Sequence, residues 1–298
     1  MNFKFLLSTT SLVTALLLSN ATLAADLYVT GTPVEPTVLP AVSGINGKIA
    51  IEGGGFDKEG FGLITGSLSL PLGNPFGVQI DAMAGARDGK FIGGGGGHLF
   101  WRNPAHGLIG VYGGYTHRDD IDGSVARIGV EGEYYWENWT AKALVGVEFI
   151  DTDNPNIIVE DESFFALADI SYYANENLQL SVGHRYISER NALALGVEYQ
   201  LPQAVFSGGV SLFAEARIGE DDYQAGWGGV RFYFGEDKSL MRRHREDDPD
   251  FLGDEDLFGL EDCIPTFTPV NIDGDSESFN LMSSCTGEVT GPFSFGIT

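Results

Sequence analysis

Between residues 47 and 234 the sequence alternates apolar residues with small or polar residues, in segments of about ten residues that turn signals separate. A repeat of two residues places successive side chains on opposite faces of a β-strand. Segments of this length and pattern are typical of transmembrane β-barrels, which are apolar outside and polar inside. We identify twelve of them, near residues 47–54, 62–72, 75–86, 89–102, 107–117, 123–136, 139–150, 163–174, 177–188, 191–201, 206–218 and 223–234.

The first 24 residues have the layout of a secretory signal peptide. Met1 to Lys4 carries one Lys, Phe5 to Leu18 is largely apolar, and small residues around Ala24 suit cleavage. An N-terminal membrane anchor is the alternative, but it needs a longer apolar stretch. No run of 18 apolar residues follows residue 24, so we expect no membrane-spanning helix. Because only helices and closed barrels satisfy the backbone inside lipid, the mature chain is predicted to be a barrel or soluble.

Two kinds of connection alternate between the twelve segments. One kind is short and turn-like, as at Glu137-Asn138, and the other is richer in acidic residues, as at residues 118–122. Strict alternation requires an up-and-down meander, and an even strand count leaves both termini on one side. We therefore predict an all-β, antiparallel barrel of about twelve strands in the outer membrane of a Gram-negative cell, with periplasmic termini. Its parts are a signal peptide (1–24), a periplasmic linker (25–46), the barrel (47–234) and an acidic periplasmic tail (235–298).

Aromatic residues gather where the segments end. Two aromatic girdles flanking an apolar band are expected at the two membrane interfaces, whereas a soluble β-sandwich would use its aromatics as a core. The residues beside the short turns are Trp101, Tyr135, Trp136, Trp139, Tyr172, Tyr173, Tyr199 and Tyr233, and those toward the acidic connections are Phe91, Tyr115, Phe149, Phe164 and Tyr186.

Charged residues fix which face of each segment points inward, because a charge on the lipid face costs about 2–4 kcal/mol at mid-membrane. Small inward residues such as Gly146 and Gly183 are expected to leave room for water between the charges. Arg127 and Lys142 are expected either to oppose Glu131, Glu133 and Glu148 across the lumen or to pair with them and fill it. The predicted lumen-lining residues are Lys48, Glu52, Asp81, Arg127, Glu131, Glu133, Lys142, Glu148, Asp169, Arg185, Glu198, Glu215, Arg217 and Arg231, with His98 and Arg102 near the periplasmic mouth.

The residues after Phe234 lose the alternating pattern and are strongly acidic. Residues 235–298 contain fifteen acidic and four basic side chains, which predicts a solvated tail with local charge pairing or a docking segment for a periplasmic partner. Cys263 and Cys285 are the only cysteines, and in the oxidising periplasm we expect them to form a disulfide. Residues 273–277 lack the full calcium-loop pattern and are interpreted as a turn.

The formal net charge of −25 disfavours nucleic acid as a partner. Expected partners are outer-membrane lipid and lipopolysaccharide. The barrel-assembly machinery is also expected, because the strand ending at Phe234 resembles the assembly signal of outer-membrane barrels. The acidic connections offer hard oxygen ligands for divalent cations. His117, His184 and Ser188 lie near these connections, but no G-x-S-x-G motif accompanies them, so we predict no catalytic residue, cofactor or protein metal site. The cation-binding candidates are Asp119, Asp120, Asp122, Asp151, Asp153, Glu160, Asp161 and Glu162.

Four stretches resemble a mostly uncharacterised family of proteobacterial outer-membrane, porin-like β-barrel proteins. The resemblance covers residues 45–250 and implies the fold and the location, without a substrate or catalytic residues. The stretches are residues 97–102, 183–186, 191–196 and 238–248.

Three functions remain open from the sequence. The first is a narrow diffusion channel for ions or small solutes, with a weak cation preference from the acidic connections. The second is a structural or interaction barrel with a filled lumen, and the third is an outer-membrane lipid-modifying enzyme. An eight-stranded barrel is filled by side chains and a sixteen-stranded one holds a channel, so for twelve strands the contents of the lumen decide.

Overall fold

The computed structural model describes residues 39–56, 59–153, 162–188, 190–202, 208–220, 223–251, 266–270 and 278–282. The expected signal peptide, Cys263, Cys285 and residues 273–277 lie outside this part of the chain. No helix in the described part is long and apolar enough to cross a membrane. Twelve strands make the body of the protein: β1 (Asn46–Phe56), β2 (Glu59–Pro71), β3 (Phe76–Arg87), β4 (Lys90–Asn103), β5 (Gly107–Arg118), β6 (Gly123–Trp136), β7 (Trp139–Thr152), β8 (Glu162–Asn175), β9 (Leu178–Ile187), β10 (Arg190–Gln200), β11 (Gly209–Gly219) and β12 (Gln224–Phe234).

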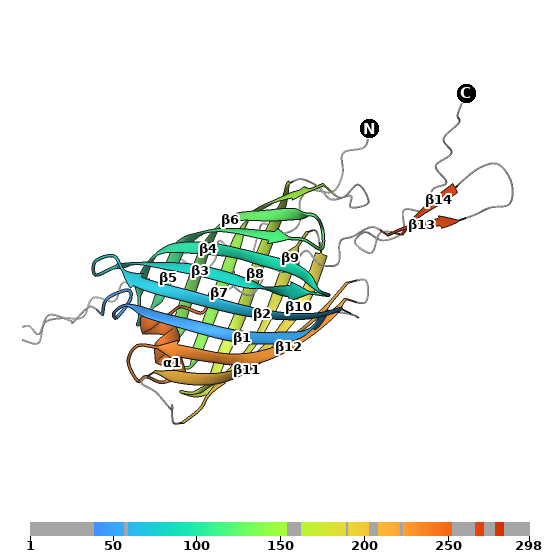
Figure 1. Cartoon of the computed structure of the whole chain (residues 1–298). Helices are drawn as coiled ribbons and strands as arrows, with labels where there is room; N and C mark the ends of the chain where they lie inside the picture. Colours follow the sequence, from blue (N-terminus) through green and yellow to red (C-terminus); the bar gives the residue numbers. More distant parts are fainter. Residues whose placement is uncertain are drawn as a thin grey trace, which may run out of the picture. The chain divides into compact units, whose positions relative to one another are not determined.

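The strands form one closed antiparallel barrel (Figure 1). Each strand pairs with its neighbours in sequence, and β1 closes the ring by pairing with β12 as well as with β2. The predicted all-β, up-and-down barrel of twelve strands is therefore confirmed. Closure matters physically because a closed sheet leaves no unpaired strand edge inside the membrane.

The outer face of the barrel is an apolar belt. Ile128 and Val130 on β6 are 62% and 56% exposed, while Arg127 and Glu131, which flank them in sequence, are buried on the inner face. Aromatic rings mark both edges of the belt. At one edge the ring centroid of Trp139 lies 5.8 Å from that of Trp136 and 4.6 Å from that of Tyr172. At the other edge the ring of Phe164 lies near that of Tyr186. This is the architecture of an outer-membrane β-barrel.

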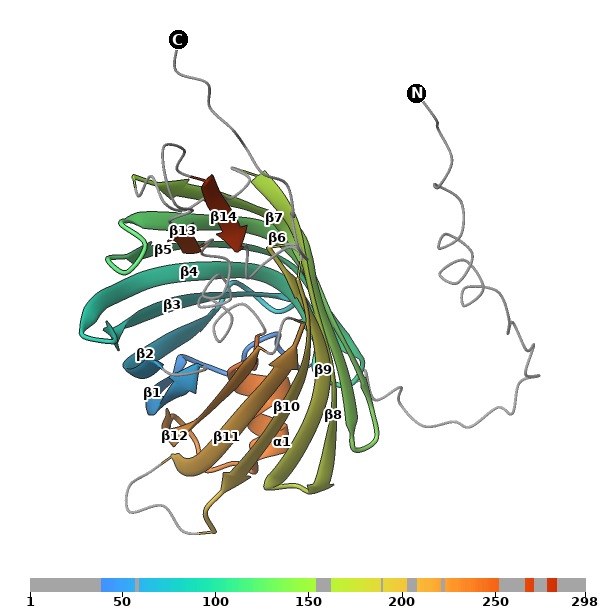
Figure 2. The same cartoon turned by 90° about the vertical axis from the view of Figure 1, so that its right-hand side faces the viewer.

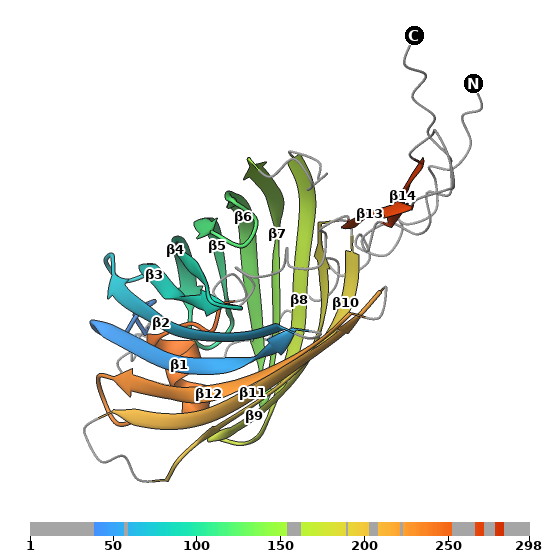
Figure 3. The same cartoon turned by 45° about the vertical axis from the view of Figure 1, so that its right-hand side comes forward.

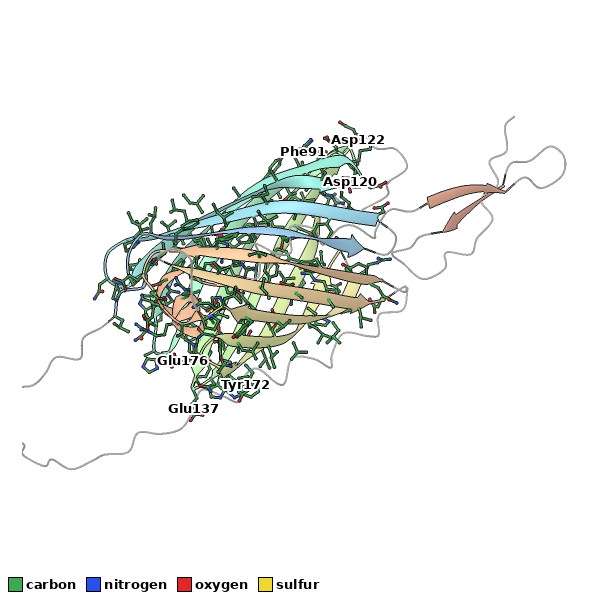
Figure 4. All side chains as sticks on the ribbon, turned by 60° about the horizontal axis from the view of Figure 1, so that its bottom comes forward. Phe91, Asp120, Asp122, Glu137, Tyr172 and Glu176 are labelled. Carbon is green, nitrogen blue, oxygen red and sulfur yellow. The ribbon has the colours of Figure 1, made fainter. Side chains whose placement is uncertain are left out.

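The two ends of the barrel are distinguished by the residues at their turns (Figure 4). One end carries Asp120 and Asp122 beside Phe91, and the opposite end carries Glu137, Tyr172 and Glu176. We call them the acidic end and the plug end. Length does not distinguish their connections as expected, because residues 88–89 at the acidic end form a turn as short as residues 137–138 at the plug end.

The chain does not leave the barrel after β12. Gly235 has a φ of 108°, which only glycine adopts readily, and a Cβ there would overlap the side chain of Asn46. The chain then forms a short helical segment, α1 (Leu240–Arg242) and η1 (Arg243–Asp247), inside the ring of strands (Figures 2 and 3). Further along, β13 (Thr266–Val270) and β14 (Ser278–Met282) pair as an antiparallel hairpin.

Candidate functional site

The plug, as we name residues 238–251, occupies the lumen at the plug end of the barrel. Leu240, Arg243 and Asp248 are 0%, 1% and 1% exposed. The sequence predicted either a solvated tail or a docking segment beyond β12, and for this stretch the solvated tail is wrong. The expected local pairing is present only in part, since Arg242 pairs with Glu246 at 2.8 Å on the exposed side of the turn.

The base of the plug is fixed to the turns that connect the strands. The backbone N–H groups of Leu240 and Met241 donate to the Asn177 side chain and to the Glu176 carbonyl, at 3.2 and 3.0 Å. Arg245 donates to the carbonyls of Glu137 and Trp139 at 2.8 and 2.7 Å. Carbonyls at turns are acceptors that the hydrogen bonds between strands leave available, so the turns of the barrel can bind the plug through their backbone.

His244 is held between two tyrosines of the wall. The Tyr173 hydroxyl lies 2.9 Å from Nδ1 of His244 and the Tyr233 hydroxyl lies 3.0 Å from Nε2. Tyr135 and Tyr173 were expected in the girdle facing lipid, but each is at most 3% exposed and points into the lumen, as Tyr233 does in agreement with the alternation along its strand. The interface needs a ring with a polar tip, and so does a polar lumen, which is why composition alone misplaced them.

Arg102 joins the plug to the segment that precedes β1. Its two terminal nitrogens donate to the carbonyls of His244 and Asp247, both at 3.2 Å, and its Nε donates to the carbonyl of Ala41. Ala41 and Val42 are buried, and the Ser43 N–H donates to the Glu246 carbonyl at 2.9 Å. We call residues 39–45 the collar, because this segment and the plug together fill the plug end.

The tip of the plug contacts the wall through charge and aromatic stacking. Ser69 donates to Asp248 at 2.9 Å, and the Lys48 ammonium donates to the Pro249 carbonyl at 3.0 Å. The Lys142 ammonium lies 2.7 Å from a carboxylate oxygen of Asp250. Beyond these contacts the plug leaves its last ring, Phe251, against the wall.

His98 provides the surface on which Phe251 stacks. The two rings are parallel within 2° and their centroids lie 3.9 Å apart. Nδ1 and Nε2 of His98 contact Glu131 at 2.9 Å and Asp81 at 3.2 Å, so two wall carboxylates fix the orientation of the imidazole. The sequence placed His98 and Arg102 near the mouth but gave no signal of their contacts with Phe251, His244 and Asp247, because these three residues belong to the segment after β12.

Other predicted lumen charges pair with each other along the wall. Arg127 on β6 and Glu148 on β7 are direct cross-strand neighbours, with 3.1 Å between Nη2 and the carboxylate. Of the two expected arrangements this pair adopts direct pairing, since the charges sit side by side along the wall and do not oppose each other across the lumen. The remaining predicted positions also face inward. Arg185 forms an ion pair with Asp169, and Arg231 forms one with Glu198. The guanidinium group of Arg217 stacks on Trp227, Glu133 accepts a hydrogen bond from Tyr135, and Glu52 and Glu215 line cavities beside Asp250.

Small inward residues make room for neighbouring side chains. A Cβ on Gly183 would overlap the carboxylate of Asp169, and a Cβ on Gly146 would come within 2.8 Å of the Phe165 ring. The expectation that these two glycines leave space for water is wrong, because the space is taken.

The histidines near the acidic end do not form a nucleophile–base pair. Nε2 of His184 lies 3.0 Å from the side-chain oxygen of Asn191, while the Ser188 hydroxyl donates to Glu148 at 2.9 Å. His117 contacts Asp119 at 3.0 Å. An acyl-transfer enzyme needs a hydroxyl within reach of its base, and these residues do not supply one.

Arg118 and Asp120 form an ion pair at the acidic connections. Burial raises the pKa of Asp120, but hydrogen bonds from Arg118 and the charges of Arg118 and Arg87 outweigh it and lower the pKa below its usual value. Within the described ranges no group of three or more His, Cys, Asp or Glu side chains is placed to hold a metal ion. Glu160 and Asp161 of the expected cation-binding set lie outside those ranges.

No known protein-family model and no curated protein matches the sequence. The fold is similar to the KdgM porin in complex with disordered oligogalacturonate, at 10% identity and a TM-score of 0.47, covering 63% of this chain and 99% of that chain. It is also similar to outer membrane phospholipase A from Escherichia coli (17% identity, TM-score 0.39, 65% and 93% covered) and to Omp33 from Acinetobacter baumannii (12%, 0.38, 64% and 98%). These likenesses concern the fold alone.

Proposed function

We propose that this protein is a narrow channel of the outer membrane that its own plug holds closed. The observation that supports this most directly is the position of residues 238–251, which fill the lumen at one end through mainly polar contacts. Polar contacts exchange for contacts with water at a small net cost, about 0.5–1.5 kcal/mol for a typical hydrogen bond. A segment held in this way can leave the lumen, whereas a fused apolar core cannot.

The wall itself suits a channel once the plug has left. The ion pairs of Arg127 with Glu148 and of Arg185 with Asp169 involve wall side chains only, so they persist without the plug. The emptied lumen would be lined by charges of both signs, and such linings pass ions and small solutes.

The orientation in the membrane follows from the two ends. The collar and the plug both lie at the end where β1 begins and β12 ends, and a chain secreted through the inner membrane inserts from the periplasm. We assign the plug end to the periplasm and the acidic end to the outside, where acidic side chains attract cations and favour them at the mouth.

Planar-bilayer recordings test the proposal with three proteins. The full chain should be silent apart from rare openings. A full-length variant that weakens the plug tip, Asp248→Asn with Asp250→Asn and Phe251→Ala, should show frequent discrete steps, and a chain ending at Gly235 should conduct continuously. Arg242→Gln is the matched control, because Arg242 is on the same segment but 52% exposed, and it should behave like the full chain.

A barrel with a permanently filled lumen is the second candidate. Hydrophobic clusters on the inner wall favour it, among them Leu144, Phe165 and Leu167. The recordings separate the two candidates. If both plug variants are folded, as their migration without heating shows, and inserted yet silent, the channel proposal is wrong and the barrel is structural.

A further inference from the structure

The lumen between the plug and the acidic end has two hydrophobic clusters on opposite walls. One contains Leu63, Met83 and Trp227 and spans β1 to β4, β11 and β12. The other is the Leu144–Phe165–Leu167 cluster, on β5 and β7 to β9. Neither includes a plug residue, because Phe251 packs in a third cluster with Ala41, Val42, Phe100 and Leu108. Apolar side chains that stay buried on two facing walls need an element between them that excludes water.

Buried arginines accompany the two clusters in the half of the lumen toward the acidic end. Arg127, Arg185 and Arg217 are 4%, 3% and 3% exposed there. A guanidinium group has five N–H donors, so it can bind carboxylates in addition to those of its own wall. An occupant that combines apolar and acidic side chains would match this lining.

The plug extends along the inner wall of the barrel toward this region. Met241 and Arg245 contact the turns at the very end of the barrel, at Glu176 and Glu137. Asp248 reaches Ser69, two residues inside the end of β2, and Phe251 reaches His98, five residues inside the end of β4. Successive plug residues therefore lie progressively deeper in the lumen.

The route back to the plug end is filled. Leu240, Arg243 and Asp247 of the plug are at most 1% exposed, and so are Ala41 and Val42 of the collar. A returning strand would need a channel about 5 Å by 10 Å across, which side chains this tightly packed do not leave. The chain beyond Phe251 can therefore continue only toward the acidic end.

The sequence that follows Phe251 fits the lining. Residues 252–262 contain the apolar residues Leu252, Leu257, Phe258 and Leu260, five acidic residues and no basic one. His98 lies eight residues from the start of β4 at the acidic end, a height of about 20 Å for a tilted strand. An extended chain covers about 20 Å in roughly six residues, so this segment is long enough.

We propose that the chain beyond Phe251 continues through the lumen and leaves by the acidic end, so that the C-terminal region is displayed outside the cell. Residues 252–262 are the occupant between the two hydrophobic clusters, and the region from Cys263 onward is on the outer surface. The even strand count alone predicts a periplasmic C-terminus, but the filled plug end overrides it. The proposal goes beyond the channel function, because it concerns where the tail lies while the channel is closed.

Epitope accessibility on intact cells tests the proposal. The full chain carries one epitope in each of three versions: after Thr298, in the turn at Gly89 of the acidic end, or in the turn at Asn138 of the plug end. The epitope after Thr298 should bind antibody on intact cells as strongly as the one at Gly89. The epitope at Asn138 should bind only after the outer membrane is permeabilised.

A second labelling experiment is needed in case a protease removes the epitope from the cell surface. In a background with Cys263→Ser and Cys285→Ser, the variant Thr298→Cys should react with a polyethylene-glycol maleimide, too large to cross the outer membrane, on intact cells. Reaction at Thr298→Cys only after permeabilisation, together with an epitope hidden in the same way, would overturn the proposal. Such a result would leave the channel proposal standing, since the chain ending at Gly235 tests conduction without the tail.

Discussion

The ammonium group of Lys142 and the carboxylate of Asp250 lie 2.7 Å apart and join the wall of the barrel to the tip of the plug. Both side chains are mostly buried, at 7% and 14% exposure. An ion pair in such a place holds the plug only while both charges are present, because removing one leaves the other desolvated. This pair is therefore the contact through which the plug is most easily released by a single substitution.

Asp250→Asn in the full chain should raise the open probability in bilayer recordings. Breaking a buried ion pair costs about 3–5 kcal/mol, and each 1.4 kcal/mol is a factor of ten in an equilibrium constant, so we expect at least a tenfold increase. The double variant Lys142→Met with Asp250→Asn should open less often than Asp250→Asn alone, since no unpaired ammonium remains. Equal opening by the single variant and the unchanged chain would show that this pair does not hold the plug.

Phe251→Ala should expose the plug to protease. The parallel stack on His98 and the burial of the ring are both lost, a cost of about 3–5 kcal/mol for a fully buried Phe. Trypsin should then cleave after Arg243, which is 1% exposed in the closed state, much faster than in the unchanged protein. Phe91→Ala is the control, because this ring is 50% exposed on the outer face. If cleavage is equally slow in both variants, the stack contributes nothing to closure.

Arg127→Gln should destabilise the barrel without opening it. Glu148 is 0% exposed and also accepts hydrogen bonds from Ser163 and Ser188, so the substitution removes the cation from a carboxylate that stays buried. We expect a loss of about 3–5 kcal/mol in the free energy of unfolding in lipid vesicles. The double variant Arg127→Gln with Glu148→Gln should lose less than the sum of the two single losses. Additive losses would show that the two residues do not interact.

Asp120→Asn should lower the temperature at which the barrel unfolds at neutral pH but not in acid. Because the pKa of Asp120 is lowered in the folded protein, its contribution is complete above the usual pKa of an aspartate and is lost as pH falls through the lowered value. Heat-modifiable migration measured from pH 7 downward gives the difference between the two proteins. A difference that stays constant over this range would contradict the assignment.

The alternating pattern was sufficient to predict the barrel because register, charge and turns all act locally. On β6, for example, the charges of Arg127 and Glu131 alone decide which face meets lipid. The plug could not be predicted in the same way. Its contacts join residues far apart in the chain, such as Lys48 with Pro249 and Lys142 with Asp250, and an acidic segment after the last strand has the composition of a solvated tail.

The tyrosines show the same limit at the scale of single residues. Tyr172 faces outward and Tyr173 inward, as alternation along β8 requires, yet both were assigned to the outer girdle from their position near a turn. The pattern contained the answer, because one of two adjacent residues in a strand must face the lumen. What the sequence did not show was a partner for the Tyr173 hydroxyl inside the lumen, and in the structure this partner is His244.

Gly183→Ala should destabilise the barrel although it adds one methyl group. Gly183 on β9 is the direct cross-strand partner of Asp169 on β8, and an added Cβ would overlap the Asp169 carboxylate that binds Arg185. We expect a loss of about 1–3 kcal/mol in the free energy of unfolding, the usual cost of overpacking. Gly97→Ala is the matched control, since a Cβ there meets only the Gln79 carbonyl, at an ordinary 3.6 Å. This control should be neutral or more stable by about 0.4–1 kcal/mol, because alanine restricts the unfolded chain. If both variants unfold alike in urea, the inward glycine is not needed for the ion pair, and space for water is again the better explanation of the small residues in this lumen.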